Sequence, residues 1–240
     1  SLVKERLWEL KSYWLNIILK REIIITSDGS TTIHIPEWNE QYHSKHGAIQ
    51  ESKHVFIEKG LYYYLQNNTT SALNILEIGF GTGLNTIITL LESNRLQQCI
   101  NYTGVEAYPV EMSEIKKLNY SVQLNCSKKD YESLHQSQWE KKIIFDQFFS
   151  LEKRKQLFSE IEDKNRYHII YFDAFGARVQ PDLWTEYIFM KMYDALILGG
   201  VLVTYSAKGS VRRAMQSSGF LVERLPGPPG KREMLRAIKV

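Results

Sequence analysis

The glycine-rich segment Gly79-Phe80-Gly81-Thr82-Gly83 constrains the fold of this chain more than any other feature of its sequence. It follows the short apolar run 73–78, which is typical of a buried strand, and it precedes residues 84–92, whose apolar spacing predicts a helix. Glycine allows positive φ and a close approach of backbone to a ligand. A strand, a glycine turn and a helix in succession indicate an α/β protein with a largely parallel sheet.

The rest of the chain continues this alternation. Apolar runs at 102–105, 168–172 and 201–205 predict further strands, and residues 183–198 predict a helix. Segments 220–225 and 233–240 predict a C-terminal antiparallel hairpin. Upstream, residues 23–35 predict a β-hairpin and residues 54–65 a helix, with Gly60 as its weak point. We therefore predict a doubly wound, mostly parallel sheet in residues 71–240 and a small β-containing N-terminal lobe in residues 1–70.

Composition excludes several classes of protein. The 240 residues include two cysteines and no C-x-x-C pair, which argues against a disulfide-stapled scaffold and a four-thiolate zinc site. No apolar run reaches the ~18 residues that a membrane-spanning helix needs, so we expect a cytoplasmic protein without a membrane partner. Residues 207–240 carry a net charge of +6 on a body of −3. This basic end favours a polyanion such as nucleic acid, and a solvated surface is the alternative.

Three acidic residues end predicted strands: Glu77, Glu106 and Asp173. In a doubly wound sheet, ligands bind beyond the carboxyl ends of the strands. Buried carboxylates are costly unless they are paired, so packing does not explain these positions. We interpret them as ligand-binding residues around the glycine turn.

The spacing of the turn distinguishes two nucleotide ligands. Dinucleotide-binding loops read G-x-G-x-x-G, whereas this loop reads G-x-G-x-G, the form that receives S-adenosylmethionine in class I methyltransferases. Glu106 lies 23 residues after Gly83, where it is suited to accept hydrogen bonds from both ribose hydroxyls. An NAD-linked oxidoreductase with a Rossmann fold remains the alternative at this point.

Several motifs resemble the methyltransferase part of the MnmC family of bifunctional tRNA-modifying enzymes and its free-standing MnmD-type relatives. They are the segments 77–85, 173–175, 180–184, 211–213 and 230–235, with a lead-in at 46–56, and the similarity runs from about residue 22 to the end. The resemblance implies a Rossmann-like class I methyltransferase with a doubly wound, mostly parallel seven-stranded sheet. Where the family reads Asp-Gly-Phe-Ala-Pro, this chain reads Asp173-Ala174-Phe175-Gly176-Ala177, so a different loop shape is expected there.

The resemblance implies N-methylation of the aminomethyl group at C5 of the tRNA wobble uridine, giving 5-methylaminomethyl-(2-thio)uridine. The cofactor would be S-adenosylmethionine, leaving S-adenosylhomocysteine, with no flavin and no metal. The expected cofactor-binding residues are Glu77, Gly79, Phe80, Gly81, Thr82, Gly83, Asn85, Glu106, Ala107 and Asp173. A methyltransferase acting on a small-molecule or protein amine, and an RNA-binding module that has lost the chemistry, are the other readings.

On the substrate side, Asp173 is the expected catalytic residue, orienting the amine and accepting its proton. The partner is tRNA, and no obligate protein partner is evident. Phe175 and Trp184 are predicted to wall a splayed-out uridine, although Trp184 could equally cap the core. Arg212, Arg213, Lys231 and Arg232 are predicted to contact phosphates.

Three further features of the sequence bear on the site. The adenine-binding acid has no clear candidate, since Asp146 is poorly registered and Ser150 is the other possibility. His43 and His46 form an H-x-x-H pair, but no acid or thiol completes a convincing metal site. Glu51 is interpreted as a surface acid rather than a residue of the cofactor pocket.

Overall fold

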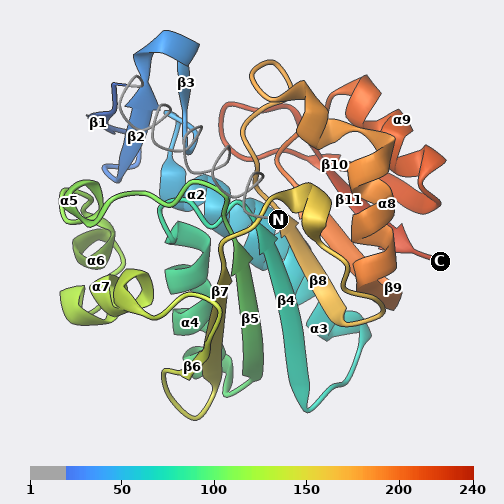
Figure 1. Ribbon diagram of the computed structural model, residues 1–240, viewed down its shortest axis with the longest axis horizontal. Coiled ribbons are helices and arrows are strands. Elements are labelled where there is room, and N and C mark those ends of the chain that lie inside the picture. Colours follow the sequence, from blue (N-terminus) through green and yellow to red (C-terminus); the bar gives the residue numbers. More distant parts are fainter. Residues whose placement is uncertain (1–19) are drawn as a thin grey trace, which may run out of the picture.

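The main body of the protein is an eight-stranded sheet, seen in a computed structural model that describes residues 20–240 (Figure 1). The strand order is β10-β11-β9-β8-β4-β5-β7-β6. The central strands are parallel, while β10, β11 and β6 pair antiparallel with their neighbours. The strands are β4 (Ala72–Ile78), β5 (Cys99–Val105), β6 (Lys142–Ile144), β7 (Phe149–Arg154), β8 (Tyr167–Phe172), β9 (Leu196–Thr204), β10 (Phe220–Pro226) and β11 (Glu233–Lys239).

The doubly wound arrangement and the C-terminal hairpin are confirmed, with one strand more than the seven expected. The sequence pattern located neither β7 nor β6, a three-residue antiparallel edge strand beside it. Strand order changes direction between β4 and β8, because the chain fills the sheet outward from β4 through β5 and β7 and then returns to β8. The carboxyl ends of β4, β5 and β8 therefore meet where a ligand site is expected.

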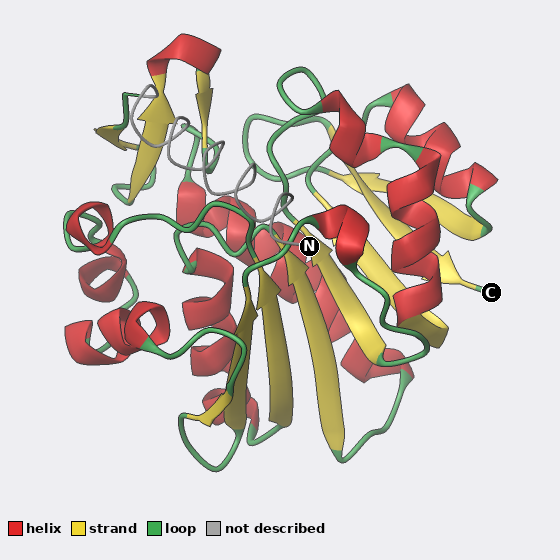
Figure 2. Ribbon diagram, viewed as in Figure 1, coloured by secondary structure: helices red, strands yellow, loops and turns green. Residues whose placement is uncertain are grey.

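Helices cover both faces of the sheet (Figure 2). One apolar core lies between the sheet and helices that include α2 (Ala48–Ser52), η2 (Lys53–Tyr62) and α4 (Leu84–Leu96). The other core lies between the sheet and α8 (Glu186–Ala195) and α9 (Gly209–Ser217). Neighbouring residues of one strand serve different cores, as Ile75 and Leu76 do, because side chains alternate across a strand. The remaining helices are α3 (Tyr63–Asn67), α5 (Met112–Ile115), α6 (Tyr120–Gln123) and α7 (Lys128–Gln136), with short 3₁₀ turns η1 (Pro36–Trp38), η3 (Phe158–Glu160) and η4 (Pro181–Trp184).

The first part of the described chain forms a small three-stranded antiparallel sheet. Its strands are β1 (Glu22–Ile25), β2 (Thr31–Ile35) and β3 (Glu40–Gln41). The predicted hairpin is thus confirmed. Asn119 attaches it to the main body, accepting from the backbone N–H of Thr31 (2.8 Å) and donating to the carbonyl of Gly29 (2.9 Å). The division of the chain at residue 70 stays a prediction.

Two predicted helices differ from the structure. The helix expected over 183–198 ends at Ala195, because Leu196 is extended (ψ 148°) and pairs with Tyr167 at the start of β9. The helix expected over 54–65 begins earlier, and residues 53–62 form a π-helix. Gly60 lies against the sheet there: a Cβ on it would come within 3.0 Å of Val203. A glycine is therefore needed at this position for close packing, although it weakened the helical pattern in the sequence.

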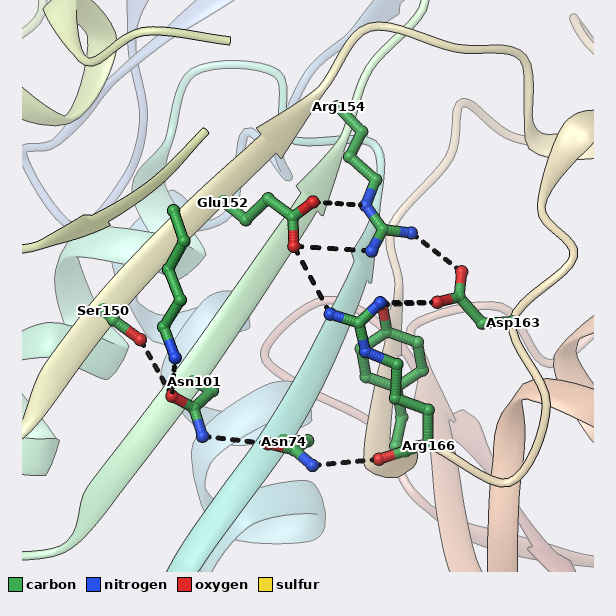
Figure 3. A network of polar contacts seen from close by, with 9 residues as sticks. Asn74, Asn101, Ser150, Glu152, Arg154, Asp163 and Arg166 are labelled. Carbon is green, nitrogen blue, oxygen red and sulfur yellow. Dashed lines mark hydrogen bonds and ion pairs between the residues drawn. The ribbon is translucent and has the colours of Figure 1, made fainter. Parts of the chain in front are cut away.

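Polar side chains of β4, β5 and β7 form a network with the segment that precedes β8 (Figure 3). Arg154 bonds Glu152 (3.0 Å) and Asp163 (2.8 Å), and Arg166 bonds the same two carboxylates. Asp163 belongs to the connection 155–166 between β7 and β8, whose one regular element is the short turn η3. The ion pairs therefore tie this connection to the sheet.

No helix within residues 20–240 is both long enough and apolar enough to cross a bilayer.

Candidate active site

The glycine turn after β4 is held close to two neighbouring strands. Gly79, Gly81 and Gly83 all have positive φ (91°, 47° and 69°). A Cβ on Gly79 would come within 2.7 Å of the carbonyl oxygen of Asp173, so the close approach of the turn to the end of β8 requires glycine. The N–H groups of Gly79 and Phe80 donate to the carbonyl of Val105 at the end of β5. The turn is thereby fixed between the ends of β5 and β8.

Glu106 lies at the end of β5 with both carboxylate oxygens positioned by backbone. Oε2 accepts from the N–H of Gly81 (3.0 Å), and Oε1 accepts from the N–H of Tyr108 (2.9 Å). Burial raises the pKa of Glu106, while the backbone donors and Arg21 oppose the rise. A carboxylate held in this way keeps free lone pairs toward the cavity. It can therefore accept hydrogen bonds from a diol.

Asn85, in the first turn of α4, joins two acids. Its Nδ2 donates to Oε1 of Glu77 (3.0 Å) and to Oδ2 of Asp173 (2.8 Å), and its Oδ1 accepts from the hydroxyl of Ser52 (2.5 Å). Burial and the nearby charge of Glu51 together raise the pKa of Asp173 to about 7, although the hydrogen bond from Asn85 and the charge of Lys231 oppose the rise. Burial likewise raises the pKa of Glu77 to about 8. Asp173 is therefore poised to exchange a proton near neutral pH.

These strand ends open into a cavity of about 780 Å³. Ten of the predicted residues line it, and they come from four strand ends or turns: Gly79, Phe80, Gly81, Thr82, Asn85, Glu106, Ala107, Asp173, Phe175 and Lys231. The volume lies in the range of small-molecule and cofactor sites. The structure thus brings the glycine turn and two strand-end acids to one cavity wall.

Other predicted residues lie away from the cavity. Glu77 is fully buried beneath Asn85, and Gly83 is covered by His135 and Phe80. Trp184 is 5% exposed and packs on Phe172 with ring centroids 5.0 Å apart, so it belongs to the core. Its indole N–H donates to the carbonyl of Phe175 (2.8 Å), so it supports the loop after β8 from behind. Three predicted phosphate contacts also lie outside the cavity lining: Arg212, Arg213 and Arg232.

The N-terminal segment supplies cavity residues that sequence reasoning missed. Tyr42 and Trp38 both meet Phe175 edge to face, with ring centroids 4.8 and 5.7 Å apart. These three rings form an aromatic wall of the cavity. Glu51, interpreted from sequence as a surface acid, is 5% exposed and lines the cavity, so that interpretation is wrong. The local sequence pattern gave no signal that Trp38, Tyr42 or Glu51 lines the cavity.

Both sequence candidates for the adenine-binding position lie at the opposite edge of the sheet. Asp146 precedes β7 and accepts from the N–H groups of Phe148 and Phe149 (2.8 Å each). Ser150 is the second residue of β7 and bonds Asn101. Neither lines the cavity. Leu157 and Phe158, which follow β7, line it instead and offer an apolar surface.

His43, the first histidine of the pair, has hydrogen-bond partners of its own near the N-terminal sheet. Nδ1 of His43 lies 3.3 Å from the hydroxyls of Thr32 and Tyr120, and burial lowers the pKa of His43 to about 4. Among residues 20–240, no group of three or more His, Cys, Asp or Glu side chains is arranged to hold a metal ion.

Comparisons with known proteins agree with this geometry. Residues 151–240 match the model of a family described as S-adenosyl-L-methionine-dependent methyltransferase. The bifunctional protein MnmC of Leptospira interrogans, named for tRNA 5-methylaminomethyl-2-thiouridine biosynthesis, is 30% identical over 212 residues, and that of Nitrosospira multiformis is 29% identical over 210. The chain belongs to this MnmC-like family of S-adenosyl-L-methionine-dependent methyltransferases.

The MnmC-like chain matches only part of these relatives. The alignments cover 83% and 81% of this chain but 32% and 33% of the relatives, so it spans about a third of their length. Among solved structures, MnmC2 from Aquifex aeolicus superposes with a TM-score of 0.68 at 24% identity, covering 91% of this chain and 70% of that one. Spermidine synthase from Thermotoga maritima superposes with a TM-score of 0.58 at 14% identity, covering 93% and 70%. Both likenesses concern the fold.

Proposed function

We propose that this chain transfers a methyl group from S-adenosylmethionine to the aminomethyl nitrogen at C5 of the tRNA wobble uridine. One observation carries the proposal. Glu106 and Asp173 follow β5 and β8, the two strands on either side of β4, and both line a single cavity built on the glycine turn. The substrate is inferred from the names of the relatives, which refer to 5-methylaminomethyl-2-thiouridine in tRNA.

The residues present fit the proposed cofactor. Glu106 would accept hydrogen bonds from the ribose hydroxyls, the glycine turn would lie against the nucleoside, and Leu157 and Phe158 would border the adenine. An acid at the ribose position disfavours a 2′-phosphate, and the G-x-G-x-G spacing disfavours a dinucleotide. Once bound, the cofactor supplies a methyl group on a positively charged sulfur.

Asp173 is proposed to prepare the amine. An alkylamine resembles the lysine side chain and is mostly protonated at neutral pH. Ionised Asp173 would bind the ammonium and accept one proton, leaving the nitrogen lone pair free to attack the methyl carbon as the carbon–sulfur bond breaks. The raised pKa of Asp173, about 7, matches this exchange better than an ordinary carboxyl would.

The surroundings of the cavity fit a nucleoside drawn from RNA. The rings of Trp38, Tyr42 and Phe175 provide a surface on which a uridine could stack once it leaves the anticodon loop. Arg212, Arg213 and Arg232 lie outside the cavity, where they would contact tRNA phosphates. A cytoplasmic location follows from this substrate.

The test is incubation of the protein with labelled S-adenosylmethionine and tRNA that carries the unmethylated aminomethyl uridine, followed by nucleoside analysis. We expect label in 5-methylaminomethyl-(2-thio)uridine. Asp173→Asn should lose turnover while keeping most of its affinity for S-adenosylmethionine, because the amide cannot accept the proton. Calorimetric binding of NAD in place of S-adenosylmethionine would instead favour an oxidoreductase.

A further inference from the structure

The cavity contains a second acid, Glu51, which the mechanism above does not use. Its Oε2 accepts from the backbone N–H of Ser44 (2.8 Å), and its Oε1 accepts from Nζ of Lys231. The side chain of Glu51 is 7% exposed, whereas that of Lys231 is 31% exposed. The carboxylate is therefore fixed by backbone, while the ammonium that neutralises it sits at the end of a longer, more accessible stem.

The ammonium of Lys231 lies against a carboxylate and an aromatic ring. Its Nζ lies 4.0 Å from the ring centroid of Tyr205, at the end of β9. The Tyr205 hydroxyl donates to the carbonyl of Ala174 (2.8 Å), which fixes the ring beside Asp173. A carboxylate combined with an aromatic face is a typical arrangement for recognising an organic ammonium.

Two acids and one ammonium lie close together in this corner. Asp173 and Glu51 are two acids, and Lys231 is the basic residue that acts on Asp173. The charge of Glu51 raises the pKa of Asp173, and Ser52, the residue after Glu51 on α2, donates to Asn85, which bonds Asp173. A substrate ammonium that entered this corner would meet both carboxylates.

We propose that Glu51 and Tyr205 form the binding subsite for the substrate ammonium, and that Lys231 fills this subsite until the substrate displaces it. This inference rests on the proposed function and extends it. Glu51 would hold the ammonium at the start, and Asp173 would then take its proton. Lys231 would act as an internal stand-in for the substrate rather than as a fixed phosphate contact.

The chemistry predicts selectivity for a charged amine over a neutral group of the same size. An anticodon stem-loop with 5-aminomethyluridine should bind the protein, in the presence of S-adenosylhomocysteine, more tightly than one with 5-hydroxymethyluridine. Glu51→Gln keeps the shape and the acceptor for Ser44 but removes the charge. It should reduce this selectivity by roughly tenfold or more, since hydrogen bonds to charged groups are among the strongest in proteins. Unchanged affinity for S-adenosylhomocysteine is the control for folding.

Lys231→Met separates the two roles considered for that lysine. Without the competing ammonium, the aminomethyl stem-loop should bind several-fold more tightly, whereas the hydroxymethyl stem-loop should be unaffected. If Lys231→Met weakens the binding of both stem-loops equally, Lys231 contacts phosphate and the inference is overturned. Full selectivity for the amine in Glu51→Gln would also overturn it. If the wild-type protein transfers no methyl group to the aminomethyl stem-loop, the proposed function itself fails and the inference with it.

Discussion

Asn85→Ala removes the one side-chain donor that connects Asp173 to Glu77. Its Nδ2 lies 2.8 Å from Oδ2 of Asp173, and this hydrogen bond is the main interaction that lowers the pKa of that carboxyl. Alanine leaves Asp173 buried beside Glu51 without the donor. The pKa of Asp173 should therefore rise above its wild-type value of about 7.

The size of this effect follows from the strength of the lost bond. A hydrogen bond to a charged group contributes about 1.5–3 kcal/mol, and 1.36 kcal/mol corresponds to about one pH unit. The acidic limb of the rate profile should therefore move upward by about one to two pH units. Because the reaction needs ionised Asp173, which is about half ionised at pH 7 in the wild type, kcat/KM at pH 7 should fall by about five- to fifty-fold and recover at alkaline pH.

The assay is methyl transfer to aminomethyl tRNA between pH 5.5 and 9.5. Thr86→Val is the matched control, because the Thr86 hydroxyl donates to Oε2 of Glu77 (3.0 Å) and bonds no oxygen of Asp173. That variant should leave the acidic limb in place. An Asn85→Ala enzyme whose rate falls equally at every pH would show that Asn85 positions the cofactor and does not tune Asp173.

Three further changes test other parts of the site. In Glu106→Gln, the amide N–H₂ either faces the backbone N–H of Gly81 or replaces the oxygen that would accept from the ribose. Calorimetry should therefore show at least ~10-fold weaker binding of S-adenosylmethionine. Unaltered affinity would contradict the ribose assignment. Charge reversal at Arg212 and Arg213 should weaken tRNA binding and flatten its salt dependence, with S-adenosylmethionine affinity unchanged; unchanged tRNA affinity would place the RNA elsewhere. Glu77 has a native pKa of about 8 against an ordinary 4.5, so the native state retains a proton that the unfolded state loses. The free energy of unfolding should therefore fall from pH 5 to pH 8, and denaturant titrations should show a smaller fall in Glu77→Gln; an equal fall in both proteins would assign the pH dependence to other groups.

The centre of the site could be predicted because its residues follow directly from strand ends. Glu106 and Asp173 end apolar runs, and parallel strands bring their carboxyl ends to one edge of the sheet. The G-x-G-x-G spacing of residues 79–83 identified the glycine turn. Periodicity likewise predicted most strands, and it failed at residues 196–198, where an apolar segment pairs as a strand immediately after a helix.

The other side of the cavity could not be predicted, because it depends on contacts between distant segments. Glu51 meets Lys231 across 180 residues of sequence, and Tyr42 meets Phe175 across the cavity wall. Lys231 was predicted as a cation for phosphate, but the structure turns its ammonium inward, since Glu51 is buried and needs a counter-ion. Trp184 illustrates the opposite error, because a large aromatic residue beside a motif packs into the core.

A crystal structure of the complex with S-adenosylhomocysteine is the most direct measurement of the site. We expect the ribose hydroxyls to bond the Glu106 carboxylate, and the sulfur to lie in the cavity on the side of Asp173. A nucleoside bound away from the glycine turn, or a sulfur that faces away from Asp173, would contradict this account of the site.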